Sequence, residues 1–243
     1  VAKTFPDYFE ALFGLVQADP AEVPVITIDG PSASGKGTLA AALAKRLGWH
    51  FLDSGAVYRA TALAAQRAGV PLDDEAAVAR VAATLDLRFE GDRIWLAGED
   101  VGDILRLEST GAAASRVSAW PAVRQALHAL QLSFRRAPGL VADGRDMGTV
   151  IFPQATLKVF LTASAAERAA RRYKQLISKG FQASIADLRA DIEARDARDR
   201  SRVAAPLKPA EDALSLDNSA LGIDPSVDAV HQWWRQRNPL DQG

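Results

Sequence analysis

The chain has 243 residues, of which 48% are hydrophobic, and its formal net charge is −1. This length suffices for one sizeable core with small insertions, and the charge argues against a broad nucleic-acid surface. No apolar run approaches the roughly 20 residues that span a bilayer. The absence of cysteine excludes disulfides and thiolate zinc sites. We expect a cytoplasmic monomer that binds neither nucleic acid nor membrane.

Residues 1–22 precede the first predicted strand and form an N-terminal extension. The apolar residues of "FPDYFEALFGLVQ" recur at helical spacing, which favours a short amphipathic helix docked on the domain or on a partner. The alternative is a targeting segment. It is disfavoured because Asp7 and Glu10 interrupt the apolar run and only Lys3 precedes it.

A phosphate-binding loop follows the first strand. "PVITID" (24–29) is apolar and β-branched, as in strands buried on both faces, and "LAAALAKRL" (39–47) consists mostly of strong helix formers. Between them, Gly30, Gly35 and Lys36 match the spacing G-x-x-x-x-G-K. The glycines let backbone N–H groups converge on an anion at a helix N-terminus. A tight turn without a ligand is the alternative, but strand, spacing, lysine and helix coincide.

Beyond this loop, short apolar strands alternate with helices, which predicts parallel strands joined by crossovers. The strands are expected at 50–53, 139–143, 156–162 and 213–217, and the helices at 54–69, 121–137, 164–179 and 225–237. Two segments interrupt the rhythm: 86–100 alternates as a β-hairpin around Gly91-Asp92, and 184–202 is a charged helix. We therefore expect an α/β protein, a three-layer α/β/α P-loop fold with a parallel sheet, a small β-rich insert and a helical lid.

Polar residues gather where two of these strands end. In "LDSGAVYR", Ser54 is predicted to cap the helix that follows Asp53, and Arg59 lies early in that helix. By itself this is an ordinary helix start with an incidental arginine. In "ADGRDMGT", Asp143, Arg145 and Asp146 emerge at the carboxyl end of a strand, the edge where open α/β sheets bind ligands. A plain polar loop is the alternative there.

The charged run "EARDARDRSR" (193–202) has a distinctive helical pattern. Arg195, Arg198, Asp199 and Arg202 share one face of a helix, and Arg200 points away from it. A solvated helix laced with ion pairs is the ordinary explanation of such a run. However, three arginines against one acid leave unpaired positive charge, which suits a ligand rich in oxyanions.

Taken together, these stretches resemble the bacterial cytidylate (CMP) kinases, a family of nucleoside monophosphate kinases. The resemblance rests on "VITIDGPSASGKGT", "FLDSGAVYRA", "VADGRDMGTVIFP", "RDARDRSR" and "APLKPAEDALSLDNS", and it covers about residues 24 to 236. The strict P-loop motif has Ser or Thr where this chain has Gly37, with Thr38 one residue later. The GKGT ending is itself usual in nucleoside monophosphate kinases.

The resemblance implies transfer of the γ-phosphoryl group of ATP to CMP or dCMP, with Mg²⁺, and a role for each matching residue. It assigns residues 23–78, 116–180 and 206–243 to the core, 79–115 to a β-containing insert that binds the nucleoside monophosphate, and 181–205 to the lid. The expected ATP-binding residues are Gly30, Pro31, Ser32, Ala33, Ser34, Gly35, Lys36, Gly37 and Thr38. The expected catalytic residues are Lys36, Arg145, Arg195 and Arg198. The expected metal-site residues are Thr38 and Asp143.

The same resemblance implies an acceptor site. Its expected residues are Ser54, Arg59, Ser115, Arg124, Arg145, Asp146, Arg195, Asp199 and Arg202. Arg59, Arg145 and Arg195 would clamp the acceptor phosphate, and Asp199 would accept hydrogen bonds from the ribose. Ser115 and Arg124, with Asp146 and Arg202, would form the pocket for the base. Without the resemblance, Ser115 and Arg124 are ordinary helix-surface residues.

Two other functions are compatible with a P-loop. A kinase for another acceptor, such as UMP, AMP or a small metabolite, is the nearer one. The other is a nucleotide-dependent switch that signals by changing conformation. Guanine-reading GTPases use Asn-Lys-x-Asp, and here Asn218 and Asn238 are followed by Ser and Pro, which excludes that motif.

Overall fold

The computed structural model describes residues 19, 21–90, 93–178, 180 and 182–238. The helix predicted from "FPDYFEALFGLVQ" and the turn residues Gly91 and Asp92 lie outside these residues. Within the described part of the chain, every helix is too short or too polar to span a bilayer.

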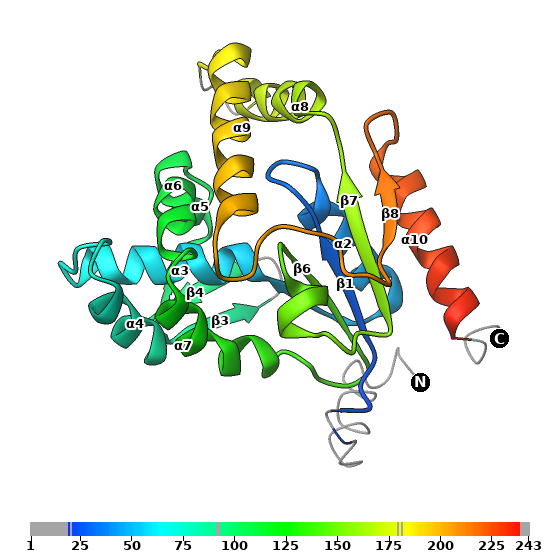
Figure 1. The fold of residues 1–243 in the computed structure, drawn as a ribbon, viewed down its shortest axis with the longest axis horizontal. Coiled ribbons are helices and arrows are strands. Elements are labelled where there is room, and N and C mark those ends of the chain that lie inside the picture. The colour runs from blue at the N-terminus through cyan, green and yellow to red at the C-terminus, as the bar shows by residue number, and fades with distance from the viewer. Residues whose placement is uncertain (1–18, 20, 91–92, 179, 181, 239–243) are drawn as a thin grey trace.

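A parallel five-stranded sheet forms the centre of the molecule, in the order β2-β6-β1-β7-β8 (Figure 1). Its strands are β1 (Val25–Asp29), β2 (His50–Asp53), β6 (Leu140–Gly144), β7 (Leu157–Thr162) and β8 (Leu214–Asp217). All five predicted strands are confirmed to within one residue at each end. An aspartate is the last residue of β1, β2 and β8 and the second-last residue of β6. The carboxyl edge of the sheet is therefore rich in acidic side chains.

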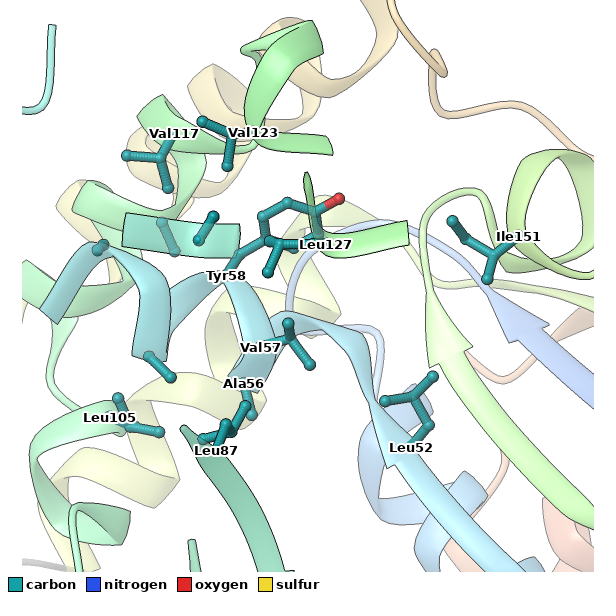
Figure 2. Close-up of a cluster of buried hydrophobic side chains, with 14 of the residues drawn as sticks. Leu52, Ala56, Val57, Tyr58, Leu87, Leu105, Val117, Val123, Leu127 and Ile151 are labelled. Atoms are coloured by element: carbon teal, nitrogen blue, oxygen red, sulfur yellow. The ribbon is translucent and has the colours of Figure 1, made fainter. Parts of the chain in front are cut away.

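Helices cover both faces of this sheet, and alternate residues of β1 enter two different cores. Ile26 and Ile28 pack against α2 (Lys36–Leu47) and α10 (Ile223–Arg237). Val25 faces the other core, which Figure 2 shows around Leu52 and Leu127. That second core also receives side chains from α3 (Ser54–Arg67) and α7 (Pro121–Leu132). The expected three-layer α/β/α arrangement is therefore confirmed.

Helix α7 ends at Leu132, five residues before the predicted end at 137. The next residues make tertiary and local contacts that a continued helix would not permit. Arg135 donates from Nε to the Val23 carbonyl oxygen (2.8 Å) and from Nη2 to that of Ala21 (2.7 Å). Arg136 donates from Nε to the carbonyl oxygen of Ser133 (3.0 Å). Long-range hydrogen bonds thus outweigh the helical propensity of Arg135, Arg136 and Ala137.

A second, antiparallel sheet follows helix α4 (Glu75–Ala83). It consists of β3 (Leu87–Glu90), β4 (Arg93–Leu96) and β5 (Glu99–Asp100), with Leu87 opposite Leu96. The pairing of β3 with β4 confirms the hairpin expected over 86–100. The short helices α5 (Gly102–Leu105) and α6 (Glu108–Val117) follow β5, and α6 packs against α3.

Helices α8 (Ala165–Ser178) and α9 (Ile185–Ser201) stand beyond the carboxyl edge of the central sheet, beside the loop after β1 (Figure 1). The charged stretch predicted at 184–202 is therefore one helix. Helix α9 passes between that loop and helix α6, and its two sides face different neighbours. This placement brings the charged face of α9 over the edge where the acidic strand ends gather.

Candidate active site

The loop between β1 and α2 has a backbone suited to anions. Ala33 and Gly35 both have left-handed backbone conformations, with φ of 58° and 89°. Left-handed residues within a tight turn direct successive N–H groups to one side, which makes an anion-binding concavity. Gly35 is also the N-cap of α2, so the unpaired N–H groups of that helix face the loop. The loop is therefore formed for an anion such as a phosphate.

Lys36, the first residue of α2, is buried beneath this loop, with a relative exposure of 9%. Its Nζ donates to the carbonyl oxygen of Pro31 (3.4 Å). Burial and the nearby Arg145 lower the pKa of Lys36 to about 8, against the opposing effect of Asp143 and Asp53. A bound polyphosphate would add negative charge and favour the protonated amine. Lys36 is thus a partly desolvated cation held at the anion site.

Gly37 lies beside the carboxylate of Asp143, at the end of β6. A Cβ atom on Gly37 would lie 3.3 Å from Oδ2 of Asp143, so a serine or threonine there would crowd the carboxylate. Burial, followed by repulsion from the neighbouring Asp53, raises the pKa of Asp143 to about 7. Among the described residues, Oδ1 of Asp143 is buried without a hydrogen-bond partner. A carboxylate therefore stands beside the place where the strict motif has its metal-binding hydroxyl, and Thr38 lies exposed one residue further.

An unpartnered carboxylate oxygen at this place fits a hard cation such as Mg²⁺, which prefers oxygen ligands and commonly keeps several of its waters. Asp143 and the hydroxyl of Thr38 are the two protein oxygens that the sequence predicts for this ion. Thr38 is in the first turn of α2, and Asp143 lies beside that turn at the carboxyl end of β6. Asp143 and Thr38 therefore fit a bound Mg²⁺ ion.

A second pocket lies next to the loop, between α3, α6, α7 and α9. All nine residues expected in the acceptor site line it, together with Ser32 of the loop and Tyr58 of α3. They come from five places far apart in the sequence: the start of α3, the end of α6, α7, the end of β6, and α9. The structure thus brings these residues together, and their individual roles stay predictions.

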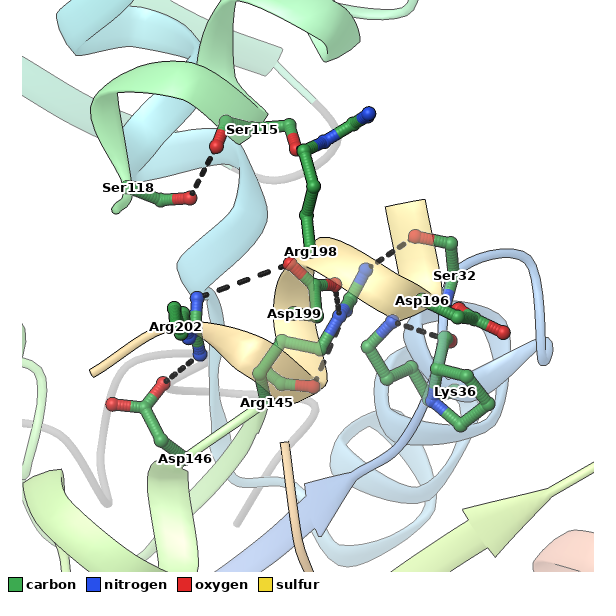
Figure 3. Close-up of polar contacts among 12 residues, drawn as sticks. Ser32, Lys36, Ser115, Ser118, Arg145, Asp146, Asp196, Arg198, Asp199 and Arg202 are labelled. Atoms are coloured by element: carbon green, nitrogen blue, oxygen red, sulfur yellow. Dashed lines mark hydrogen bonds and ion pairs between the residues drawn. The ribbon is translucent and has the colours of Figure 1, made fainter. Parts of the chain in front are cut away.

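Arg145 joins the two sites. Its Nη2 donates to Oγ of Ser32 in the loop (2.8 Å), and its Nε donates to Oδ2 of Asp199 in α9 (2.9 Å), as Figure 3 shows. One guanidinium therefore contacts the loop of the predicted ATP site and a wall of the predicted acceptor site. Arg145 therefore lies between the two predicted sites.

The wall of the second pocket nearest α7 contains a buried ion pair between Arg124 and Asp146. Their side chains are 8% and 3% exposed, and Arg124 also donates to the Ser118 carbonyl oxygen (3.2 Å) and lies 5.7 Å from the Tyr58 ring centroid. Arg202 places Nη2 3.7 Å from Oδ1 of Asp146, and burial lowers the pKa of Arg202. Asp146 thus lies between two guanidinium groups, with one oxygen held by Arg124.

Two arginines of α9, Arg195 and Arg198, contact side chains of α6. Arg195 donates to Oε2 of Glu108 in α6 (2.8 Å), and Arg172 of α8 contacts the same carboxylate. Burial raises the pKa of Glu108, but Arg172 and then Arg195 together hold it below its usual range. Arg198 donates from Nε to Oγ of Ser115 (3.4 Å). Exposed Arg200 lies on the opposite side, so the predicted helical face is confirmed.

Ser54 does not cap helix α3, contrary to the sequence prediction. Asp53 is the N-cap: its Oδ1 accepts from the backbone N–H of Ala56 (2.9 Å), and its own backbone is extended. Aspartate at this position adds a negative charge to the positive end of the helix dipole. Ser54 becomes the first helical residue, which places it in the wall of the second pocket.

Arg168 and Asp196, a buried pair that contacts the loop, were missed by sequence reasoning. Arg168 sits in "AAERAARR", which resembles an ordinary exposed helix. Asp196 lies within the charged run, but off the face that contains Arg195 and Asp199. A signal was available: Asp196 is four residues after Ile192, an apolar residue that marks a buried face.

The sequence is similar to proteins of one known family. A sequence profile described as "Cytidylate kinase" matches residues 26–236. A cytidylate kinase of Ralstonia pickettii (strain 12J) is 59% identical over 213 residues, covering 88% of this chain and 92% of its own. One of Bordetella bronchiseptica is 57% identical over 220 residues, covering 90% and 99%. The profile match includes all five strands of the central sheet, except for Val25 at the start of β1. The chain therefore belongs to the cytidylate kinase family.

Proposed function

We propose that this chain transfers the γ-phosphoryl group of ATP to CMP or dCMP, giving ADP and CDP or dCDP. Membership in the cytidylate kinase family supports the reaction. The observation that carries the site assignment is the position of Arg145, which hydrogen-bonds at once to Ser32 of the anion-binding loop and to Asp199 of the second pocket. Two adjacent sites joined by one cation suit the meeting of two phosphates.

The chemistry needs positioning and charge rather than a general base. The phosphate of a nucleoside monophosphate is already an anionic nucleophile. Phosphoryl transfer passes through a loose transition state, so the protein acts mainly by aligning donor and acceptor and by stabilising the charge that moves between them. The second pocket has the groups for this, because five of its lining residues are arginines.

On the donor side, residues 30–38 wrap the phosphates of ATP. Lys36 lies at the β- and γ-phosphates and stabilises charge as it shifts to the leaving group. Mg²⁺, held by Thr38 and through water by Asp143, would neutralise charge on the phosphate oxygens when bound. The unpartnered Oδ1 of Asp143 supports its share of that role.

On the acceptor side, Arg59, Arg145 and Arg195 bind the phosphate of CMP. Arg195 must exchange its ion pair with Glu108 for the substrate phosphate, so the insert and the lid helix α9 are coupled to acceptor binding. Arg198 lies on the same side of α9 and reaches the transferring group when the lid closes. Closure would also exclude water, which competes as an acceptor.

The remaining pocket residues read the nucleoside. Asp199 accepts hydrogen bonds from the ribose, and Ser54 holds the nucleotide near its phosphate. Ser115, Arg124, Asp146 and Arg202 surround the base. The buried Arg124–Asp146 pair supports this assignment, because a fixed donor and a fixed acceptor side by side suit the polar edge of a pyrimidine.

A coupled assay of ATP consumption against CMP, dCMP, UMP and AMP tests the proposal. We expect the highest kcat/KM with CMP or dCMP. A higher value with UMP or AMP would assign the chain to another acceptor. Tight ATP binding without turnover of any monophosphate would favour a nucleotide-binding protein without kinase activity. Sedimentation at the assay concentration tests the expected monomer.

A further inference from the structure

Ser32, in the anion-binding loop, is held on three sides. Its carbonyl oxygen accepts from Nη1 of Arg168 (2.8 Å), its backbone N–H donates to Oδ1 of Asp196 (3.4 Å), and its Oγ accepts from Arg145 (2.8 Å). Arg168 belongs to α8, Asp196 to α9 and Arg145 to the end of β6. Both helices that stand over the sheet edge therefore hydrogen-bond to the backbone of the same loop residue, α9 to its N–H and α8 to its carbonyl oxygen.

Arg168 and Asp196 also bind each other, in a pair removed from solvent. Nη2 of Arg168 lies 2.6 Å from Oδ2 of Asp196, and the two side chains are each 5% exposed. Nε of Arg168 donates to the carbonyl oxygen of Ala163 (3.0 Å). A buried ion pair is tolerated only where hydrogen bonds satisfy the remaining donors and acceptors. Here the backbone of Ser32 supplies two of those bonds, so the pair and the loop depend on each other.

The contacts of Ser32 matter for the conformation of the next residue, Ala33. Ala33 is left-handed, with φ of 58°, a conformation that disfavours residues with a side chain. Such strain persists only where the surroundings fix the backbone. The grip on the N–H and carbonyl of Ser32 fixes the backbone immediately before Ala33. The left-handed turn at Ala33 is what directs N–H groups of the loop toward an anion.

We propose that Arg168 and Asp196 are positioning residues for the donor-phosphate loop. They hold Ser32 from the side of the lid, so that Ala33 keeps the left-handed turn and the loop is ready for the phosphates of ATP. Asp196 directly follows the acceptor-facing Arg195 and projects about 100° around α9 from it, so one helix contacts the loop through Asp196 and faces the acceptor pocket through Arg195. The inference rests on the proposed function for the identity of the anion.

The test separates ATP from CMP. Asp196→Asn removes the charge that pairs with Arg168 but keeps the size of the side chain. ATP and CMP affinities are each measured by calorimetric titration of the full chain, with the other nucleotide absent, and turnover is measured separately. We expect ATP affinity to fall about tenfold or more, because a charge-assisted hydrogen-bond network is lost, while CMP affinity changes less than about twofold. Asp191→Asn, the same change at an exposed position of α9, is the control and should leave both affinities unchanged.

ATP affinity within twofold of the wild type in Asp196→Asn would overturn the proposal, as would equal losses of ATP and CMP affinity. If Asp196→Asn does not fold, Arg168→Lys provides the same test. Lysine keeps the positive charge but cannot reach Ala163, Ser32 and Asp196 together, so the selective loss of ATP affinity is expected again. A folded Arg168→Lys protein with wild-type ATP affinity would refute the inference. Failure of wild-type protein to phosphorylate CMP would instead refute the proposed function and leave the ATP titrations interpretable.

Discussion

Nη2 of Arg145 lies 2.8 Å from Oγ of Ser32, so the end of β6 is hydrogen-bonded to the loop that follows β1. The same guanidinium pairs with Asp199, whose side chain is 10% exposed. These two contacts use guanidinium donors of the kind that bind phosphate oxygens. Under the proposed function, substrate binding would exchange these hydrogen bonds of the Arg145 guanidinium for bonds to phosphate oxygens.

Lys36→Ala should leave a folded protein whose turnover is reduced about 100-fold or more. Lys36 is buried under the loop at 9% exposure, and one preorganised charge in such a site contributes about 3 kcal/mol to transition-state stabilisation. Steady-state kcat with CMP and ATP measures the effect. Lys45→Ala, an exposed lysine of the same helix, is the control. Retention of more than half of wild-type kcat in Lys36→Ala would rule out the assignment of the loop to ATP chemistry.

Arg195→Ala should raise KM for CMP and also lower kcat. Arg195 faces the acceptor pocket from α9, where it is held by Glu108. Arg200→Ala removes the same charge from the exposed side of that helix and should change neither parameter by more than about twofold. Both variants are compared by full kinetic titration of CMP at saturating ATP. Equal changes of KM and kcat in the two variants would show that the arginines act through their summed positive charge, whichever side of the helix they are on.

A pH-dependent stability difference should distinguish Asp29→Asn from the wild type. Burial raises the pKa of Asp29 to about 6, although the N–H groups of Gly148 (2.8 Å) and Met147 (2.9 Å) donate to it and oppose the shift. The folded state therefore keeps a proton that the unfolded state has lost between about pH 4 and pH 6. Asp29 consequently makes stability fall as pH rises through this window.

The measurement is the free energy of unfolding by urea at pH 4.5 and pH 6.5 for both proteins. Wild type should lose about 2 kcal/mol more than Asp29→Asn over this interval, at up to about 1.4 kcal/mol per pH unit for one proton. Asparagine is expected to lower stability at both pH values, because its amide nitrogen cannot accept from an N–H group. The difference between the two slopes is the signal, and parallel profiles would contradict the raised pKa.

Most of the fold was predictable because its signals are local. Five short apolar strands with helices between them specify a parallel sheet, and the spacing of Gly30, Gly35 and Lys36 specifies the loop. The gathering of the acceptor residues was predictable from the family resemblance, since Ser115 and Arg124 have no distinguishing local pattern. The end of α7 was not predictable, because Arg135 stops the helix through contacts with residues more than 100 positions away.

Which residues form the site was easier to predict than which of them contact one another. Asp53 rather than Ser54 caps α3. Both residue types are favoured at the N-cap, but the extended backbone that an N-cap requires is at Asp53. The grip of Arg168 and Asp196 on Ser32 joins segments 28 and 164 residues apart along the chain. Charge patterns on one helix cannot show which neighbouring helix or loop supplies the partner.

The base preference gives the sharpest prediction. Cytosine offers an amino donor at position 4, and uracil offers a carbonyl acceptor. Ionised Asp146 only accepts hydrogen bonds. Arg124 occupies its Oδ2, and Nη2 of Arg202 stays 3.7 Å from its Oδ1, which leaves that oxygen able to accept from the cytosine amino group. A mismatched buried polar group costs about 1–3 kcal/mol, so kcat/KM for CMP should exceed that for UMP by roughly tenfold or more.

Asp146→Asn should narrow this ratio, because its NH₂ group can turn toward the uracil carbonyl. The variant will also be less stable, since it leaves the guanidinium of Arg124, 8% exposed, without its charged partner. The ratio of kcat/KM values for CMP and UMP within one protein cancels any loss of folded enzyme. Asp199→Asn, in the same pocket but assigned to the ribose, is the matched control and should lower both values while keeping the ratio. A ratio in Asp146→Asn equal to that of the wild type would remove Asp146 from base recognition. Its ion pair with Arg124 would then serve to hold the first turn of α7 against the loop after β6.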